Sequence, residues 1–238
     1  MSEALATCET ESHETPQAVF FDWDGTLANT IPLLFRAHNH VRELMGFDAW
    51  SMVEFYSNLR FSSLDLYPRI YGERAEEALS TLYRFMHDNH LDHIEALNGA
   101  EEILKELHAG GCTVGIVSNK RHDLLVKEIA HMGWDKYISC AVGAGQAERD
   151  KPYPDPLLKA FEQANMKPHP EKGWGYVWYV GDTVTDMELA ANVGCKAVLV
   201  LNDEEKEELI RSFGPFLVIN DCQDLKNTLK NSIQLVVS

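Results

Sequence analysis

The sequence lacks long hydrophobic runs and is poor in positive charge. No apolar stretch approaches the roughly 20 residues that a membrane-spanning helix needs. The first 17 residues, MSEALATCETESHETPQ, contain no lysine, arginine or hydrophobic block, so we expect a short disordered tail over 1–16 rather than a signal or transit peptide. Lysine and arginine total 21 against 37 acidic residues, a formal net charge of −16. Such a surface repels nucleic acid and anionic membranes, which argues against both as partners.

Cysteine pairs and nucleotide-binding glycine motifs are also missing. The five cysteines lie far apart at positions 8, 112, 140, 195 and 222 and form no CxxC. This spacing argues against a disulfide framework or structural zinc and favours a reducing cytoplasm. The sequence has no P-loop, and "GAG" at 143–145 lacks the further glycine of a dinucleotide fingerprint.

Short apolar runs alternate with helical patterns over most of the chain. The helical patterns include "GAEEILKELHAGG", "DPLLKAFEQANM" and "TDMELAANVG". Such alternation predicts an α/β fold, a Rossmann-like parallel sheet of at least five strands with helices on both faces. The runs that we expect to form strands are 18–21, 113–117, 138–143, 176–180, 197–201 and 216–219.

Residues 30–94 interrupt this alternation with helical periodicity alone. Leu34, Ala37 and Val41 mark one apolar face, and Thr30 before Pro32 is a plausible helix start. We therefore expect a helical cap at 30–94, inserted into a discontinuous core formed by 17–29 and 95–238. The acidic run 202–209 is most simply the solvated start of a helix.

Polar residues directly follow four of the apolar runs. Because ligands bind outside the carboxyl ends of parallel strands, these residues are the ones that can meet. They are Asp22 and Asp24 after the first run, Ser118, Asn119 and Lys120 after the second, Lys151 in the loop beyond the third, and Asp182 with Asp186 after the fourth.

Clustered carboxylates without a counter-charge raise each other's pKa and destabilise a fold. A hard divalent cation with oxygen ligands relieves this repulsion, and Mg²⁺ suits a site that also holds water and a phosphate oxygen. One aspartate can then remain ionised as a nucleophile, while the other carries a proton as acid and base.

The residues "DWDGT", "SN", "KP" and "GDTVTD" resemble, in order, the four motifs of the haloacid dehalogenase superfamily. The match extends from about residue 17 to about 222, and the insertion resembles the small helical cap of the phosphoglycolate phosphatase-like branch. The resemblance implies a Mg²⁺-dependent phosphatase that acts on a small phosphorylated metabolite through a phosphoaspartate.

The resemblance also implies a role for each motif residue. Asp22 would be the nucleophile and Asp24 the general acid and base. Ser118 would bind the phosphoryl oxygens, together with Asn119, and Lys151 would neutralise charge. The metal ligands would be Asp22, the backbone carbonyl of Asp24, Asp182, and Asp186 either directly or through water.

Within the cap, Arg60 in "NLRFSS" is the best candidate for contact with a substrate anion, although a solvated surface arginine is the simpler interpretation. A β-phosphoglucomutase-type sugar-phosphate mutase is the nearest alternative, weakened because Leu34 stands where that branch has a histidine. A signalling module that accepts phosphate without turnover is a third alternative. The histidines of "HDNHLDH" fit a frayed helix end better than a metal site.

Four further residues near these motifs have weaker links to the chemistry. Thr26 and Thr183 are expected to be structural, and Lys120 is as consistent with a solvated residue as with a site residue. Trp23 should point away from the metal and serve packing, since alternate residues of a strand face opposite sides. Neither the natural substrate nor the oligomeric state follows from the sequence.

Overall fold

The computed structural model describes residues 16–201 and 212–237; the expected tail over 1–15 and the acidic run 202–209 lie outside the described residues. Within the described part, six parallel strands form one sheet in the order β3-β2-β1-β4-β5-β6. The α/β architecture predicted from the sequence is therefore confirmed. The strands are β1 (Ala18–Phe21), β2 (Thr113–Arg121), β3 (Cys140–Ala144), β4 (Val177–Gly181), β5 (Lys196–Val200) and β6 (Leu217–Ile219).

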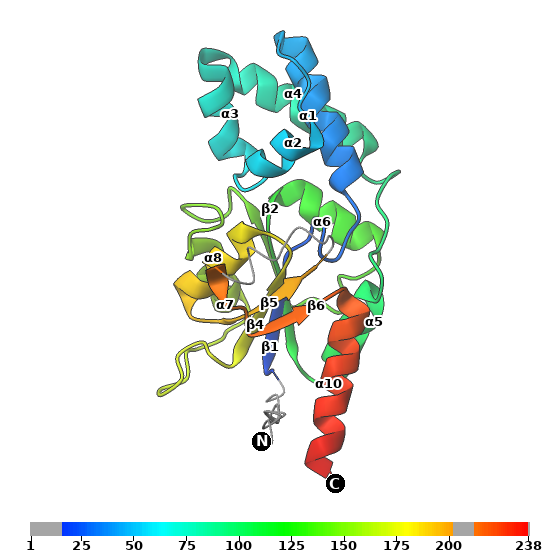
Figure 1. The fold of residues 1–238 in the computed structure, drawn as a ribbon, viewed down its shortest axis with the longest axis vertical. Helices are drawn as coiled ribbons and strands as arrows, with labels where there is room; N and C mark the ends of the chain where they lie inside the picture. The colour runs from blue at the N-terminus through cyan, green and yellow to red at the C-terminus, as the bar shows by residue number, and fades with distance from the viewer. Residues whose placement is uncertain (1–15, 202–211, 238) are drawn as a thin grey trace, which may run out of the picture.

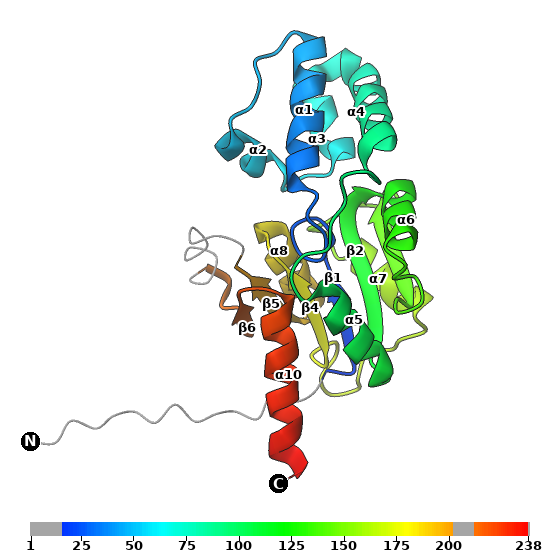
Figure 2. The ribbon, with the colours of Figure 1, turned by 90° about the vertical axis from the view of Figure 1, so that its right-hand side faces the viewer.

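Helices cover both faces of the sheet (Figures 1 and 2). Val19 and Phe21 of β1 face one apolar core, and Ala18 and Phe20 face the other, which is why the strand is apolar throughout. The helices of the first core are α5 (Ala100–Ala109), α6 (His122–His131) and α10 (Cys222–Val237). Those of the second are α7 (Asp155–Gln163) and α8 (Val184–Val193).

Residues 31–89, between β1 and α5, form only helices, and these lie beyond the carboxyl ends of the strands (Figure 1). They have an apolar core of their own that includes Val41, Phe55, Tyr67 and Leu82. This arrangement is consistent with the cap expected at 30–94, and we use "cap" for these residues below. The helices are α1 (Ile31–Met45), α2 (Met52–Asn58), α3 (Ser63–Tyr71), the 3-10 turn η1 (Gly72–Arg74) and α4 (Ala75–Asn89).

Strand β2 differs from the expected strand at 113–117 because it continues to Arg121. Its ladder with β3 shifts register after Val117 and resumes where Arg121 pairs with Ala144. Ser118 and Lys120 are buried, whereas Asn119 is half-buried and Arg121 is exposed, the alternation of a strand. The polar residues after the apolar run thus belong to the strand itself.

None of the described helices is long and apolar enough to cross a membrane.

Candidate active site

Asp22 and Asp182 lie side by side because they follow two neighbouring strands. β1 pairs with β4 in parallel, and the Asp22 backbone N–H donates to the Val180 carbonyl at 2.9 Å. Gly25 turns the chain directly above Asp182 with a φ of 82°. A Cβ at Gly25 would lie 2.8 Å from Asp182 Oδ2, so only glycine allows both the turn and this close approach.

Thr26 fixes the second carboxylate: its hydroxyl donates to Asp182 Oδ1 at 3.0 Å. Thr26 is therefore structural, as expected, and the group that it positions is the carboxylate of Asp182.

Asp186 lies behind these two carboxylates and is fully buried. Its Oδ1 accepts from Lys151 Nζ at 2.8 Å and from the Tyr179 hydroxyl at 3.2 Å. Its Oδ2 accepts from the Thr183 backbone N–H at 3.0 Å and from the Thr183 hydroxyl at 2.6 Å, forming the capping box of α8. Since both oxygens are occupied, Asp186 acts in this arrangement chiefly by holding Lys151 in place.

Lys151 links the nucleophile candidate to this buried cluster. Its Nζ lies 2.7 Å from Asp22 Oδ1, and the side chain is 3% exposed. Both carboxylates raise the pKa of Lys151 well above its usual value, although burial alone would lower it. The lysine thus remains a cation beside Asp22.

Asn119 positions the loop that carries Lys151. Its side-chain amide donates to the Lys151 carbonyl at 3.1 Å, and its Oδ1 accepts from the Lys151 N–H at 3.0 Å. Although Asn119 borders the pocket, its amide is committed to this loop, so the substrate-binding role expected for it stays a prediction. Ser118 is buried in the same pocket wall, and its Oγ accepts from the Lys120 N–H at 3.2 Å.

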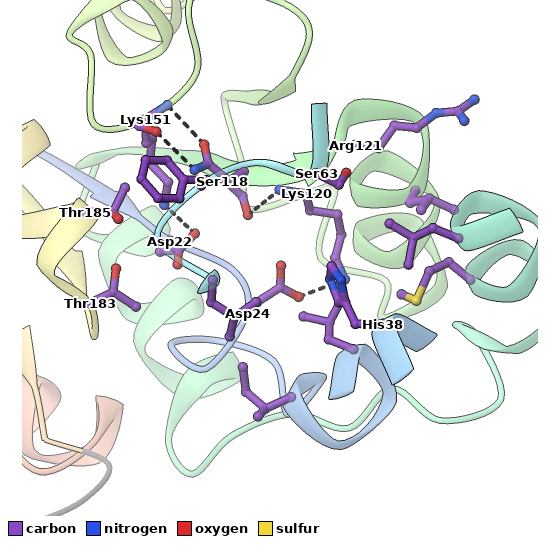
Figure 3. A pocket seen from close by; sticks show the side chains of 18 of the residues that line it. Asp22, Asp24, His38, Ser63, Ser118, Lys120, Arg121, Lys151, Thr183 and Thr185 are labelled. Carbon is purple, nitrogen blue, oxygen red and sulfur yellow. Dashed lines mark hydrogen bonds and ion pairs between the residues drawn. The ribbon is translucent and has the colours of Figure 1, made fainter. Parts of the chain in front are cut away.

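Asp24 faces a second buried lysine across the site (Figure 3). Its Oδ1 lies 2.7 Å from Lys120 Nζ and also accepts a hydrogen bond from the Thr30 hydroxyl. Because both contacts use Oδ1, the contacts with described residues leave Oδ2 for proton transfer. Thr30 also precedes α1, as expected, but its side chain does not cap that helix.

Glu128 of α6 holds Lys120 from behind. Its Oε2 lies 2.9 Å from Lys120 Nζ, and its two oxygens also contact His90 Nδ1 at 2.9 Å and Trp23 Nε1 at 2.6 Å. Glu128 is 0% exposed, so this carboxylate is held by hydrogen bonds rather than by water. Lys120 is therefore a site residue, which the sequence left undecided.

Trp23 packs in the core with its ring centroid 5.7 Å from that of Trp134, which confirms the packing role expected for it. Its hydrogen bond to Glu128 gives no signal in the sequence, because Glu128 lies 105 positions away.

Arg60 lies outside the pocket lining. Its guanidinium is 3.8 Å from the Glu188 carboxylate of α8, with half of its side chain exposed, and its backbone carbonyl accepts from the Thr185 hydroxyl at 3.0 Å. The structure thus uses Arg60 to join the cap to the core and does not bring it to the site with the other expected residues.

The pocket between core and cap encloses about 110 Å³. Its lining on the core side includes Asp22, Asp24, Asp182, Lys120 and Lys151. Residues of α1, α2, α3 and α4 line it from the cap side, among them His38 and Ser63 in Figure 3. His38 of α1 is part of that cap wall and gives no motif signal, since a lone histidine within a helical pattern is usually a core residue.

The electrostatics of the site call for additional positive charge. Burial, opposed by Lys151 and reinforced by the three neighbouring aspartates, raises the pKa of Asp22 to about 8. Protonated carboxyls are poor nucleophiles, so Asp22 needs a further cation nearby to be ionised at neutral pH.

A divalent metal ion fits this donor set. Oxygens of Asp22, Asp182 and Asp186 lie within 4.8 Å of one another, and all three residues are buried. Three carboxylates with only oxygen donors suit Mg²⁺ rather than a softer ion. Asp22 and Asp182 are the better ligands, because Asp186 already uses both oxygens.

Buried carboxylates and two buried lysines at the base of one pocket make this the candidate active site. The comparisons with known proteins specify the enzyme. Residues 19–200 match the family model described as haloacid dehalogenase-like hydrolase. The chain belongs to this family and is a hydrolase, as the four motifs predicted.

Relatives extend the likeness over nearly the whole chain. "Pyrophosphatase PpaX" of Halalkalibacterium halodurans is 28% identical over 207 residues, which cover 87% of this chain and 94% of that protein. The crystal structure of a HAD-superfamily hydrolase from Ehrlichia chaffeensis is 25% identical, with a TM-score of 0.61 over 92% of this chain and 98% of that one. A hydrolase from Pseudomonas syringae, 21% identical, has the same fold, with a TM-score of 0.77 over 90% and 98%.

Proposed function

We propose that the chain is a Mg²⁺-dependent phosphatase that hydrolyses a small phosphorylated metabolite through phosphorylated Asp22. The observation that carries this proposal is the position of Asp22. It lies buried at the base of the pocket between core and cap, 2.7 Å from Lys151 and next to Asp182, with Asp24 across from it. The family and the name of the PpaX relative support it.

In the first half of the reaction, a carboxylate oxygen of Asp22 attacks phosphorus. The new bond joins that oxygen to phosphorus, and the ester bond between phosphorus and the alcohol oxygen breaks. Asp24 Oδ2 gives its proton to the departing oxygen, so that the product leaves as a neutral alcohol. Lys120 and Thr30 hold the other oxygen of Asp24 and thereby orient Oδ2.

In the second half, Asp24 Oδ2 takes a proton from water, whose oxygen attacks phosphorus. The bond between phosphorus and the Asp22 oxygen breaks, which releases inorganic phosphate and regenerates the Asp22 carboxylate. Lys151 compensates negative charge on Asp22 and on the phosphoryl group, and the Ser118 hydroxyl donates to a phosphoryl oxygen. Asp22 and Asp182 would hold Mg²⁺, with Asp186 behind them, and the ion would supply the charge that keeps Asp22 ionised and stabilises the phosphoryl oxygens.

Two further features belong to the proposal. The substrate enters and leaves as the cap opens and closes, which excludes bulk water during the reaction. The reducing cytoplasm is the proposed compartment, because the four described cysteines are all free thiols.

The test is turnover of p-nitrophenyl phosphate and of a metabolite panel with and without Mg²⁺. Rapid quench with ³²P-labelled substrate should capture label on the wild-type chain and none on Asp22→Asn. Asp22→Asn should lose at least about 10³-fold in kcat while it keeps the wild-type circular dichroism spectrum. Metal-independent turnover, or label retained by Asp22→Asn, would contradict the proposal.

The same assay separates the alternatives. A single stoichiometric phosphorylation without turnover would indicate a signalling module. Interconversion of glucose phosphates would indicate a mutase.

A further inference from the structure

The cap wall of the pocket is mainly apolar. All of residues 30–94 are described, so this wall is known completely. The apolar side chains that it contributes are Ile31, Leu34, Leu59, Phe61, Leu82 and Met86. Against such a wall, removing an apolar group of the substrate from water favours binding, whereas removing a charged group from water opposes it.

None of the six arginines of the cap contributes to this wall, and the cap contains no lysine. The guanidinium of Arg42 lies over the Trp50 ring, 4.6 Å from its centroid, and that of Arg69 lies over Phe61 at 4.6 Å. Arg74 pairs with Glu77 at 2.9 Å. Arg60 faces Glu188, and Arg36 and Arg84 are exposed.

The cations that the core places in the pocket are already paired with carboxylates. Lys151 lies between Asp22 and Asp186, and Lys120 lies between Asp24 and Glu128. Arg121 Nε lies 2.6 Å from Asp123 Oδ1, and its guanidinium stacks over the Tyr83 ring at 4.4 Å. Lys151 serves the transferring phosphoryl group and Lys120 orients Asp24, so within the described chain the pocket lining offers no unpaired cation to the remainder of the substrate.

Apart from His38, the polar groups of the cap wall are the hydroxyls of Tyr56, Ser63 and Tyr83, and a hydroxyl carries no positive charge. Burial lowers the pKa of His38 to about 4, so its imidazole is uncharged at neutral pH. His38 Nδ1 shares a 3.1 Å hydrogen bond with the buried Tyr67 hydroxyl. The hydroxyls of Ser63 and Tyr83 lie 3.0 Å apart. These groups can hydrogen-bond a hydroxyl or carbonyl of a substrate, but they give little compensation to a carboxylate or a second phosphate.

We propose that the substrate is a phosphate monoester of a small, uncharged and largely apolar alcohol, without a second anionic group. This inference rests on the proposed function and specifies its substrate class. It separates the chain from a pyrophosphatase, whose leaving group is itself a phosphate, and from the phosphoglycolate-like substrate that the motif resemblance suggests.

Three isosteric esters test the inference on the wild-type chain with Mg²⁺. Isobutyl phosphate, phosphoglycolamide and 2-phosphoglycolate share one heavy-atom skeleton and end in an apolar, a neutral polar and an anionic group. We expect kcat/KM for isobutyl phosphate to exceed that for phosphoglycolate at least about tenfold, with phosphoglycolamide closer to the isobutyl ester. Inorganic pyrophosphate should be used no better than phosphoglycolate.

A cation placed in the wall should weaken or abolish this preference. Leu34 lies on the pocket side of α1. Leu34→Lys should lower the ratio of kcat/KM for isobutyl phosphate to kcat/KM for phosphoglycolate at least about tenfold. Val53→Lys adds the same charge to α2 at a position 75% exposed and outside the lining, and it should leave the ratio unchanged within about twofold.

Equal or better use of phosphoglycolate or pyrophosphate by an enzyme that still requires Mg²⁺ and Asp22 would overturn the substrate class alone. Absence of turnover for every ester, p-nitrophenyl phosphate included, would overturn the proposed function as well. The comparison within the wild-type chain decides between these outcomes even if Leu34→Lys fails to fold.

Discussion

Lys120 neutralises two carboxylates that come from different parts of the molecule. Its Nζ lies 2.7 Å from Asp24 in the loop after β1 and 2.9 Å from Glu128 on α6. Burial alone would lower the pKa of Lys120, but the two carboxylates raise it, so the ammonium persists inside the protein. Lys120 thereby connects the stability of the fold with the orientation of the general acid.

The first prediction concerns Lys120→Met. Loss of the cation leaves the buried Glu128 and the partly buried Asp24 without their shared counter-charge, which should lower the free energy of unfolding by about 3–5 kcal/mol. It should also lower kcat about 10²-fold, because Asp24 is no longer oriented. Urea denaturation and p-nitrophenyl phosphate turnover measure the two effects.

The double variant Lys120→Met/Glu128→Gln separates the effect on stability from the effect on kcat. Removal of the buried Glu128 charge should restore part of the stability, whereas kcat should stay low because Asp24 still lacks its lysine. If activity returned together with stability, Lys120 would have only a structural role.

His38 provides the second prediction, on pH. Its pKa is about 4 in the folded chain and 6.5 in the unfolded one, so the unfolded state binds the proton more tightly. Its contribution to stability is complete above pH 6.5 and is lost as the pH falls through 6.5 towards 4. Between pH 7 and pH 4.5, the free energy of unfolding should fall by up to about 3 kcal/mol more in the wild type than in His38→Gln.

Denaturation curves of both proteins at the two pH values measure this difference, and the shared acid titration of other groups cancels in it. Parallel loss of stability in the two proteins would show that His38 is protonated as readily in the fold as in water.

At the level of elements, a strand was predictable from the sequence where both of its faces are buried, because such a strand is apolar throughout. β1 and β4 are fully buried, and their apolar runs match the observed strands closely. The end of β2 was not predictable, because Ser118, Asn119 and Lys120 are polar and their strand conformation depends on pairing with a distant β3. No element is predicted after residue 219, whereas α10 packs Leu225 and Leu229 against the core.

Site residues, too, were predictable only where local sequence position determines their place in the fold. Acids and the lysine that follow predicted strands could be found by position alone, because parallel strands bring their carboxyl ends together. Glu128 and His38 lie within helices, and only tertiary packing places them near the site. Arg60 lies in a loop of the cap, where side-chain direction has no periodic signal, so the sequence could not show that its guanidinium faces Glu188.

Arg60 carries the third prediction. Its pair with Glu188 is long and half exposed, and such pairs contribute little. Arg60→Gln should therefore change kcat/KM for p-nitrophenyl phosphate by less than about threefold, as should the control Arg36→Gln on the exposed face of α1. A loss of tenfold or more in Arg60→Gln alone would restore the substrate contact expected from the sequence.

For the whole molecule, the sheet order places the site. β1 is central, with β2 on one side and β4 on the other, and the chain crosses from the β2 side to the β4 side after β3. A crevice forms at such a change of direction, and it lies between the ends of β1 and β4 where Asp22 and Asp182 meet. The cap closes this crevice, so that both parts of the chain contribute to one pocket.

The last prediction concerns this molecule with and without metal. The folded state holds the carboxyl groups of Asp22 and Asp182 together and the unfolded state separates them, so an ion that binds both should bind the folded state preferentially and stabilise it. At a Mg²⁺ concentration 100 times the dissociation constant, the free energy of unfolding should rise by about 2.7 kcal/mol. EDTA should remove both this gain and the activity.

Asp182→Asn should lose most of the Mg²⁺-dependent gain, because it removes a ligand and part of the repulsion together. Asp92→Asn, at an exposed position after α4, removes the same charge away from the site and should keep the gain. Thermal unfolding at matched ionic strength measures all three proteins. An equal response to Mg²⁺ in Asp182→Asn and the wild type would place the ion elsewhere and would remove the physical reason for two buried aspartates at neighbouring strand ends.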